Sequence, residues 1–357
     1  MARLPGPARC SRRAFLRAAF GATAALGLAA CTRSDSRTPG RWTHRYLTVA
    51  TTGGALRQAL WQAAFVPFQQ ATGCQVMDVN LPLDTLVPEL RRQILTGQTQ
   101  WDVVALDAPT IAGLASVGPA LFEALNHDTL SQLGLPAAAI SPNSASILLD
   151  TLGLAYRTAP YAGRAPTAWS EVWDASSTGF PGPRLFPANP VGLLEIALLA
   201  AGVPPDPRRL YPLDLDRAFH SLDRVRPAIT DWWAEASRPG AALAQGEADL
   251  VLAPAGSLRA AIAGGAIAAL APLPQPQLAL ALALPLRAPN GDVAQDFLAF
   301  TLDADTQAAF ASQGYRPAIP ASAKQTPTTE TTFPLDLGWW GANWAAVSAR
   351  FAAWSSR

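Results

Sequence analysis

The chain has 357 residues, half of them apolar, which is enough to give each of two domains of ordinary size its own core. Without the N-terminal leader described below, 22 basic residues stand against 26 acidic ones, a net charge of about −4. A slightly acidic body without a basic run argues against nucleic acid as a partner.

The first 31 residues carry two export motifs. Residues 11–17 read SRRAFLR, which resembles a twin-arginine signal, and the apolar run at 18–30 suits a signal peptide rather than a membrane span. The run ends in LAAC, which looks like a lipobox with Cys31 as the lipid-bearing cysteine. We therefore expect a signal at 1–31 and a polar tether at 32–42. This predicts twin-arginine export and a lipid-anchored protein in the periplasm or at the outer face of the cytoplasmic membrane.

The cysteines and histidines are too few and too scattered for a disulfide or a metal site. With Cys10 in the leader and Cys31 lipidated, Cys74 is the one thiol that remains. The histidines are single residues without metal-ligand spacing: His44, His127 and His220. We expect neither a metal nor a cofactor, and a buried packing role for Cys74.

Strands and helices alternate in the first part of the chain, which predicts a parallel sheet with both faces covered. An apolar strand at 47–50 passes through the turn at 51–54 into a helix at 55–69 with one apolar face. The predicted elements that follow are a strand at 75–79, a helix at 84–96, a strand at 101–107 and a helix at 109–117.

A second group of elements follows, and the chain then returns to the first. We place the first crossing between two lobes near Ser144, where one or two extended segments begin, and the return at 266–272. The other predicted elements are strands at 184–186, 248–252 and 278–284, helices at 191–201, 215–225 and 291–302, a turn at 314–317 and a final helix around 340–354.

Seven segments, spread along the chain in a fixed order, carry a family resemblance. They are TTGGA with FQQATGCQV, then WDVVALD, APTAWSEVWD, AQGEADLVLAPAGS, LPLRAPNGDVAQDFLAF, GYRPAIP and LDLGWWGANWAAVSARFAAW. Together they resemble bacterial extracellular solute-binding proteins of ABC importers, of the branch that contains polyamine receptors. The resemblance implies the type II periplasmic-binding-protein fold, an α/β fold with two lobes. Each lobe is a mostly parallel sheet flanked by helices, and the ligand lies in the cleft between them.

The resemblance also implies domain bounds and a function. It places lobe 1 at 43–143 plus 272–321, lobe 2 at 144–271, and a C-terminal helical segment at 322–357. The implied function is that of a monomeric receptor, not an enzyme, that captures a small polar solute and delivers it to an ABC permease. An enzyme or a sensor receptor on the same two-lobed fold is the alternative, and no GxSxG motif is present.

The resemblance supports the polyamine ligand less well. Polyamine receptors of the family hold ammonium groups with carboxylates and aromatic rings, which suits the chemistry of a desolvated cation. Here the segment expected to supply an acidic pair reads FPANP at 186–190, without a carboxylate, and the strand end expected to supply an aromatic residue reads LAPAGS at 252–257, without one. We therefore expect the receptor role and leave the solute open between a polyamine and another small polar molecule.

Candidate ligand contacts in lobe 1 lie where a helix follows a strand. Thr51, Thr52, Gly53 and Gly54 offer hydroxyls and backbone N–H groups at a helix start, although an ordinary turn has the same pattern. Asp107, at the end of a strand, fits a contact with a cationic ligand or the N-cap of the next helix.

Candidate contacts in lobe 2 are less distinct. Asn189 and Ser257 each precede a predicted helix, so each fits a ligand contact, and Asn189 equally fits a cap. The pair Trp232 and Trp233, which we place on an irregular segment, predicts either one ring in the cleft or a core ring beside a surface ring. Arg259 fits an anion contact or a solvated face. Weaker candidates are Tyr315 and Arg316, and helical spacing predicts packing for Trp339, Trp340, Trp344 and Trp354.

Overall fold

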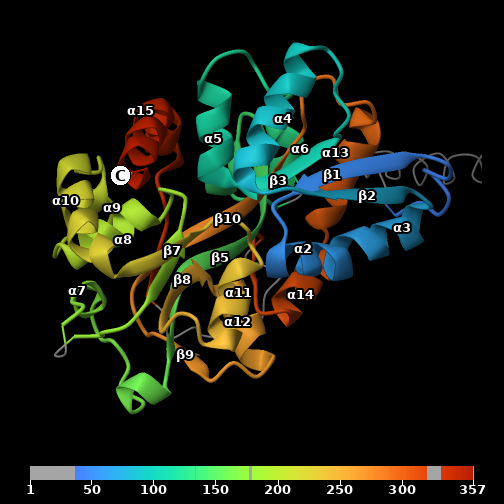
Figure 1. Cartoon of the computed structure of the whole chain (residues 1–357). Helices are drawn as coiled ribbons and strands as arrows, with labels where there is room; N and C mark the ends of the chain where they lie inside the picture. Colours follow the sequence, from blue (N-terminus) through green and yellow to red (C-terminus); the bar gives the residue numbers. More distant parts are fainter. Residues whose placement is uncertain (1–36, 133, 177–178, 320–330, 357) are drawn as a thin grey trace, which may run out of the picture.

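The computed structural model describes residues 37–132, 134–176, 179–319 and 331–356. The chain forms two lobes, each with a central sheet and helices on both faces (Figure 1). The predicted signal, the lipobox Cys31 and part of the tether lie outside the described residues.

The sheet of lobe 1 begins with the predicted parallel strands. β1 (Tyr46–Thr51) pairs in parallel with β2 (Gln75–Asn80) and with β3 (Val103–Asp107). β10 (Gln275–Ala283) lies antiparallel to β3, so the sheet is mixed. The predicted α/β fold is confirmed, with β10 as the antiparallel addition.

Alternating side chains of these strands face two helical layers, as the period of a strand requires. Val103 and Ala105 face a cluster that includes Phe68 and Phe297, whereas Val104 and Leu106 face the opposite cluster. The first layer comprises α2 (Gly54–Leu60), the π-helical turn Trp61–Phe65, α3 (Val66–Thr72), α13 (Gly291–Thr301) and α14 (Ala304–Ser312). The second comprises α4 (Leu83–Leu95) and α5 (Ala108–Ser116).

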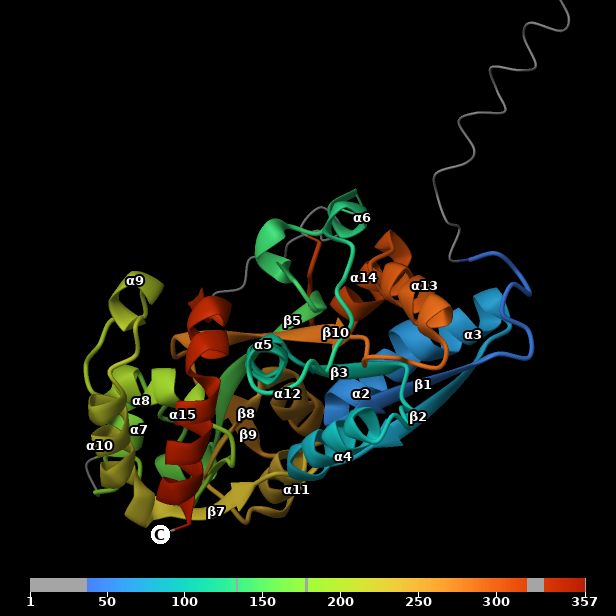
Figure 2. The ribbon, with the colours of Figure 1, turned by 90° about the horizontal axis from the view of Figure 1, so that it is seen from above.

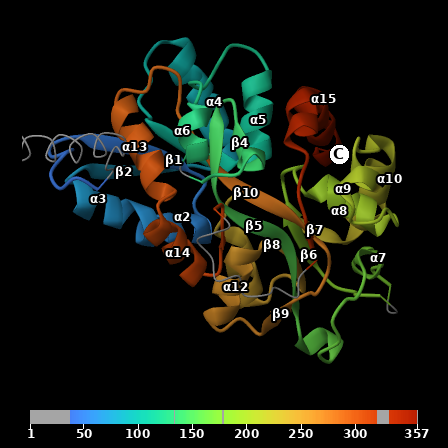
Figure 3. The same ribbon diagram turned by 180° about the vertical axis from the view of Figure 1, so that it is seen from behind.

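One long strand joins the two lobes. In β5 (Ser144–Arg157), residues 145–151 pair with β10, and residues 152–156 pair with β8 (Leu250–Pro254) of lobe 2. A single continuous strand thus belongs to the sheets of both lobes. The view from behind shows β5 and β10 as neighbouring strands at the centre of the molecule (Figure 3).

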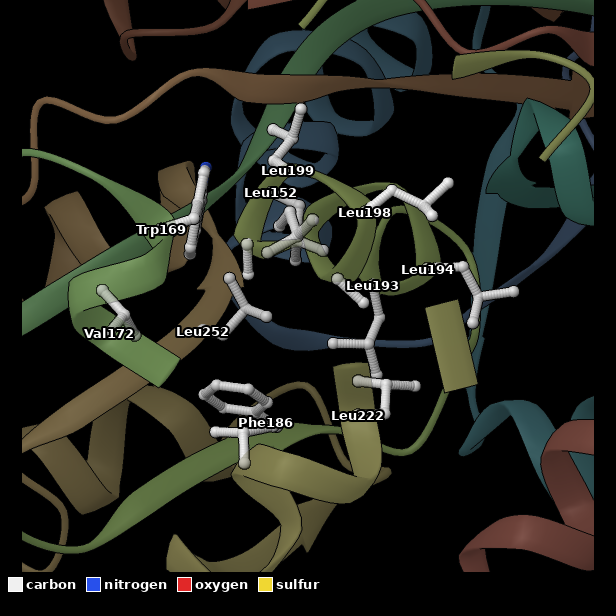
Figure 4. Packing of buried hydrophobic residues seen from close by; sticks show 14 of the residues in the cluster. Leu152, Trp169, Val172, Phe186, Leu193, Leu194, Leu198, Leu199, Leu222 and Leu252 are labelled. Carbon is white, nitrogen blue, oxygen red and sulfur yellow. The ribbon is translucent and has the colours of Figure 1, made fainter. Parts of the chain in front are cut away.

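Lobe 2 repeats the layered arrangement. β6 (Arg184–Pro187) pairs in parallel with β8 and with β7 (Ile229–Trp233), while β8 is antiparallel to β5. Residues 231–233 therefore form part of an edge strand and not the irregular segment we expected. The large core shown in Figure 4 packs Phe186 and Leu252 of the sheet against helical residues such as Leu193 and Leu222.

The helices of lobe 2 divide between the two faces of its sheet. The large core draws on α7 (Trp169–Trp173), α8 (Leu193–Ala200) and α10 (Leu215–Val225), whereas α11 (Arg238–Gln245) and α12 (Ala255–Ala263) cover the other face. Shorter elements are α6 (His127–Gln132), α9 (Pro207–Leu210), β4 (Ile140–Ser141), β9 (Ala268–Leu270), β11 (Arg316–Pro317) and β12 (Thr332–Phe333).

The last helix, α15 (Leu337–Ser355), lies between α5 of lobe 1 and the helices of lobe 2 (Figures 1 and 2). It starts after Asp336, whose side chain accepts a hydrogen bond from the backbone N–H of Trp339 at 2.9 Å. Within the described ranges, no helix is both long enough and apolar enough to cross a bilayer.

Candidate functional site

A cavity of about 500 Å³ lies between the two lobes, at the carboxyl ends of several strands. Open α/β sheets bind ligands at this edge because loops and helix starts meet there. β1, β3, β6 and β8 each bring residues at or just beyond their carboxyl ends to the cavity wall. Most of the wall is apolar, including Leu56, Leu83, Val87, Leu106, Leu148, Leu152, Val191, Leu278 and Leu280.

The predicted turn after β1 contributes two of its four residues to the wall. Thr52 and Gly53 line the cavity, whereas the hydroxyl of Thr51 points to Asp78 Oδ1 at 3.4 Å and its side chain is buried. Gly53 has φ +86°, and a Cβ there would lie 2.4 Å from Asn80 Oδ1, so this position requires glycine.

The carboxyl group of Asp107 lines the cavity and also caps α5. Its two oxygens accept the backbone N–H of Thr110 at 2.9 Å and the hydroxyl of Thr110 at 2.8 Å. Burial raises the pKa of this carboxyl, and the two bonds from Thr110 oppose the shift only in part. The two interpretations of Asp107 are therefore compatible, because a carboxylate oxygen that caps a helix keeps further acceptor capacity.

The wall from lobe 2 contains three of the predicted residues. Asn189, Trp233 and Ser257 all line the cavity. Asn189 Oδ1 accepts the N–H of Val191 at 3.0 Å, and the indole N–H of Trp233 donates to the carbonyl of Leu252 at 2.8 Å. These bonds fix the orientation of both side chains.

Trp232 lies apart from these residues, half-buried against the core of lobe 2. Its ring packs edge-on against Trp354 with centroids 5.5 Å apart, and against Phe351 at 6.4 Å. The two tryptophans therefore have different environments. Trp233 lines the cavity, whereas Trp232 contacts the C-terminal helix.

Asp150 and Arg259 form an ion pair at the part of β5 where its pairing changes from β10 to β8. Asp150 lines the cavity and accepts the N–H of Gly256 at 3.0 Å, and the guanidinium of Arg259 lies 3.4 Å away. Burial raises the pKa of Asp150, and the charge of Arg259 opposes that rise. Sequence reasoning missed Asp150, although its signal is visible as a single carboxylate within the apolar run SILLDTLG.

The two lobes touch directly on either side of this cavity. Gly54 of α2 lies against Ala236 of lobe 2, where a Cβ would come within 2.8 Å of the alanine Cβ. The guanidinium of Arg259 also donates to the carbonyl of Gly314 in lobe 1 at 3.0 Å. The two lobes are thus in direct contact beside the cavity.

The comparison with protein families agrees with this architecture. The family described as bacterial extracellular solute-binding protein matches residues 63–334, which is most of the chain. The chain belongs to the bacterial extracellular solute-binding proteins. It is the substrate-binding component of an ABC importer, and it captures a small polar solute between its lobes for delivery to a membrane permease.

Two relatives are similar to this solute-binding protein over most of its length. The γ-aminobutyric acid (GABA)-binding protein of Pseudomonas aeruginosa is 28% identical over 333 residues, which cover 87% of this chain and 91% of that protein. An ABC transporter substrate-binding protein from Bradyrhizobium japonicum has 28% identity and a TM-score of 0.75, over 87% of this chain and 99% of its own.

A third relative is a solved structure of a GABA receptor. It is 27% identical with a TM-score of 0.72, over 87% of this chain and 97% of its own. These matches support the transport interpretation and not the alternative of an enzyme or a sensor. The polyamine branch stays a prediction, because the named ligand of two of these relatives is GABA.

The remaining reactive groups of this solute-binding protein fit a binding role. Cys74 is 2% exposed, and burial raises the pKa of its thiol to about 11, so it stays protonated at neutral pH. Among the described residues, no group of His, Cys, Asp and Glu side chains has the geometry of a metal site.

Two further cavity residues come from unexpected places. Tyr315, a weak candidate from the sequence, is buried at the wall, and burial followed by the charge of Asp150 raises the pKa of its phenol. Trp344, which helical spacing assigned to packing, reaches the cavity from α15. The spacing identified the helix but could not show which neighbours each ring meets.

Proposed function

We propose that the solute is an organic amine whose ammonium group lies against Asp107 and whose body contacts the apolar wall. The single observation that carries this proposal is the sign of the charges at the cavity. Its charged lining residues are Asp84, Asp107 and Asp150, and within the described part of the chain none of its lining residues is basic.

The three carboxylates differ in their partners. Asp150 has Arg259 beside it, and Asp84 is solvent-exposed in the first turn of α4. Asp107 is half-buried, and its hydrogen bonds come from the neutral groups of Thr110. A partly desolvated carboxylate without a cation is costly to ionise, so an ammonium group that supplies the missing charge would bind favourably there.

The apolar wall adds a second requirement. Small-molecule sites of ~300 to 1,000 Å³ are mostly apolar, with a few polar groups that fix orientation. The leucines around this cavity fit methylene groups, and Trp233 and Trp344 offer ring faces on which a cation or an alkyl chain can lie. GABA and the polyamines share the required ammonium group and differ at the other end, where GABA carries a carboxylate.

A thermal-shift panel on the purified protein tests the proposal. Putrescine, spermidine and GABA form the amine arm, while butyrate, succinate and a simple phosphonate form the anionic arm. A ligand at a hundredfold excess over its Kd stabilises the folded protein by ~2.7 kcal/mol, which is a shift of several degrees. We expect a shift in the amine arm alone. A shift with the amine-free anions and none with the amines would refute the proposal.

We also propose the finer points of export and assembly. The sequence motifs support twin-arginine export, a lipid on Cys31 and a monomer tethered through residues 32–42 beside its permease. Intact-mass measurement on membrane fractions tests the anchor, and an unmodified Cys31 would contradict it.

The pairing of β5 supports a lobe boundary at Thr151 and Leu152.

A further inference from the structure

The C-terminal helix α15 is attached to lobe 2 by two indole hydrogen bonds, one buried and one partly buried. The indole N–H of Trp340 donates to Glu195 on α8 at 2.9 Å, and that of Trp354 donates to Asp223 on α10 at 2.7 Å. Trp340 is fully buried in the large core of lobe 2, together with Phe351. We therefore treat α15 as a part of lobe 2 that moves with it.

The same helix also contacts α5, which belongs to lobe 1. The indole of Trp344 lies directly over Gly113, where a Cβ would come within 2.2 Å of the ring. One turn away, the hydroxyl of Ser116 donates to the carbonyl of Gly341 at 2.5 Å. α5 is held in lobe 1 by Ile111 and Leu114. The contact between α5 and α15, which we call the α5–α15 seam, is thus a contact between lobes.

Trp344 also lines the cavity. Its ring shares the wall with Asp107, which caps the same helix α5 that carries Gly113. A single side chain therefore touches the space for the solute and the seam that forms when the lobes meet. Any solute that displaces the ring must also disturb the packing of the ring on Gly113.

We propose that Trp344 is a specificity-determining residue of the solute site. It sets the length of solute that the closed cavity accepts, because the seam fixes the position of its ring. The choice of amines as probes rests on the proposed function, whereas the lobe contact does not depend on the chemistry of the solute.

The first test compares Trp344→Ala with a matched control, Trp339→Ala. Trp339 lies on the same helix with similar burial, and its ring packs against Tyr211 and Trp340. We expect Trp344→Ala to enlarge the cavity and to shift the ratio of the Kd values for putrescine and spermidine about tenfold toward spermidine. Trp339→Ala should leave that ratio unchanged. An unchanged ratio in Trp344→Ala, or an equal shift in the control, would overturn the proposal.

The second test needs no solute. A Cβ on Gly341 would lie 3.8 Å from the Cβ of Ala112, which is the usual separation in a disulfide. The pair Ala112→Cys and Gly341→Cys, in a chain with Cys10 and Cys31 replaced by Ser, places a disulfide across the seam. Cys74 should not compete, because it is buried and its thiol pKa is raised to about 11.

We expect the disulfide to form and the radius of gyration from small-angle scattering to fall on oxidation and recover on reduction. Failure of the pair to join would show that the seam does not form, and an unchanged radius would show that the seam does not open with the lobes. Either result would overturn the proposal. If neither amine stabilises the wild-type protein, the amine proposal fails, and this second test still decides the role of the seam.

Discussion

Asp107 and Thr110 form a two-point hydrogen-bonded cap at the start of α5, at 2.9 Å from the backbone N–H and 2.8 Å from the hydroxyl. The cap holds the carboxylate of Asp107 at the wall of the cavity. The side chain of Asp107 thus caps a helix and also lines the solute cavity. A substitution can remove one of these roles and keep the other.

Asp107→Asn should separate them. Asparagine caps a helix as well as aspartate does, so we expect the free energy of unfolding in urea to change by less than about 1 kcal/mol. The loss of the charge should weaken amine binding by about 3 kcal/mol, more than a hundredfold in Kd by calorimetry. Thr110→Ala is the matched control, because it removes a capping hydroxyl and keeps the charge. Unchanged amine affinity in Asp107→Asn would contradict the assignment.

The pH dependence of amine binding should follow the ionisation of Asp107. Burial raises the pKa of its carboxyl, so the group becomes protonated at a higher pH than an ordinary aspartate. Below that pKa, we expect amine affinity to fall about tenfold for each pH unit, because binding then requires loss of a proton. Asp84 and Asp150 share the cavity, so the measured quantity is the difference between wild type and Asp107→Asn. Affinity that rises as the pH falls would contradict the prediction.

Glu195 should govern how firmly α15 is attached to lobe 2. Its Oε1 accepts the hydroxyl of Tyr211 at 2.6 Å and the indole N–H of Trp340 at 2.9 Å. Glu195→Ala leaves both buried donors without this acceptor, and we expect a loss of about 3 kcal/mol in urea unfolding. Glu195→Gln keeps an acceptor oxygen and should lose less. An alanine variant as stable as the glutamine variant would contradict this account.

The stability of the wild type should also depend on pH through Glu195. Burial raises the pKa of its carboxyl in the folded state above the value in the unfolded chain. The folded state therefore binds this proton more tightly, and the resulting stability is fully present below the unfolded pKa. It is lost as the pH rises through the folded pKa. We expect this decline in the wild type and not in Glu195→Gln, measured as unfolding free energy across the acidic and neutral range.

Gly113→Ala should hinder closure without unfolding either lobe. The added Cβ would collide with the ring of Trp344, 2.2 Å away, so the α5–α15 seam cannot form in its present geometry. We expect weaker solute binding and a larger radius of gyration in the presence of the solute. Gly291→Ala in α13 is the control, because nothing lies within 4 Å of its new Cβ. An effect of equal size in the control would contradict this prediction.

Much of the fold could be predicted because it depends on local patterns. The strand at 47–50, the turn at 51–54 and the following helix are visible as apolar periodicity and glycines, and they appear as β1, α2 and α3. The change of pairing partner within β5, from β10 up to Thr151 to β8 from Leu152, could not be predicted, because the strand is continuous and its residues do not show which strands pair with them. The edge strand β7 was missed because it is short and carries Asp231 and two tryptophans.

The candidate site could be predicted only in part, for a related reason. Thr52, Gly53, Asp107, Asn189, Trp233 and Ser257 follow strands or begin helices, and their place in the chain brings them to the cavity. Asp150 and Trp344 reach it through long-range packing, the former at the lobe crossing and the latter from a helix near the C-terminus. A single carboxylate within an apolar run indicates a special position for Asp150, and helical spacing indicates packing for Trp344, but neither pattern shows which residues the side chain meets.

The central claim, that the cavity selects a positively charged amine, is tested most directly by calorimetric titration with amines and their N-acetylated forms. Acetylation of every amine nitrogen removes the positive charge and leaves the carbon skeleton in place. For GABA, putrescine or spermidine, whichever binds, we predict that the acetylated form binds at least about a hundredfold more weakly. Equal affinity for the charged and acetylated forms would contradict the claim.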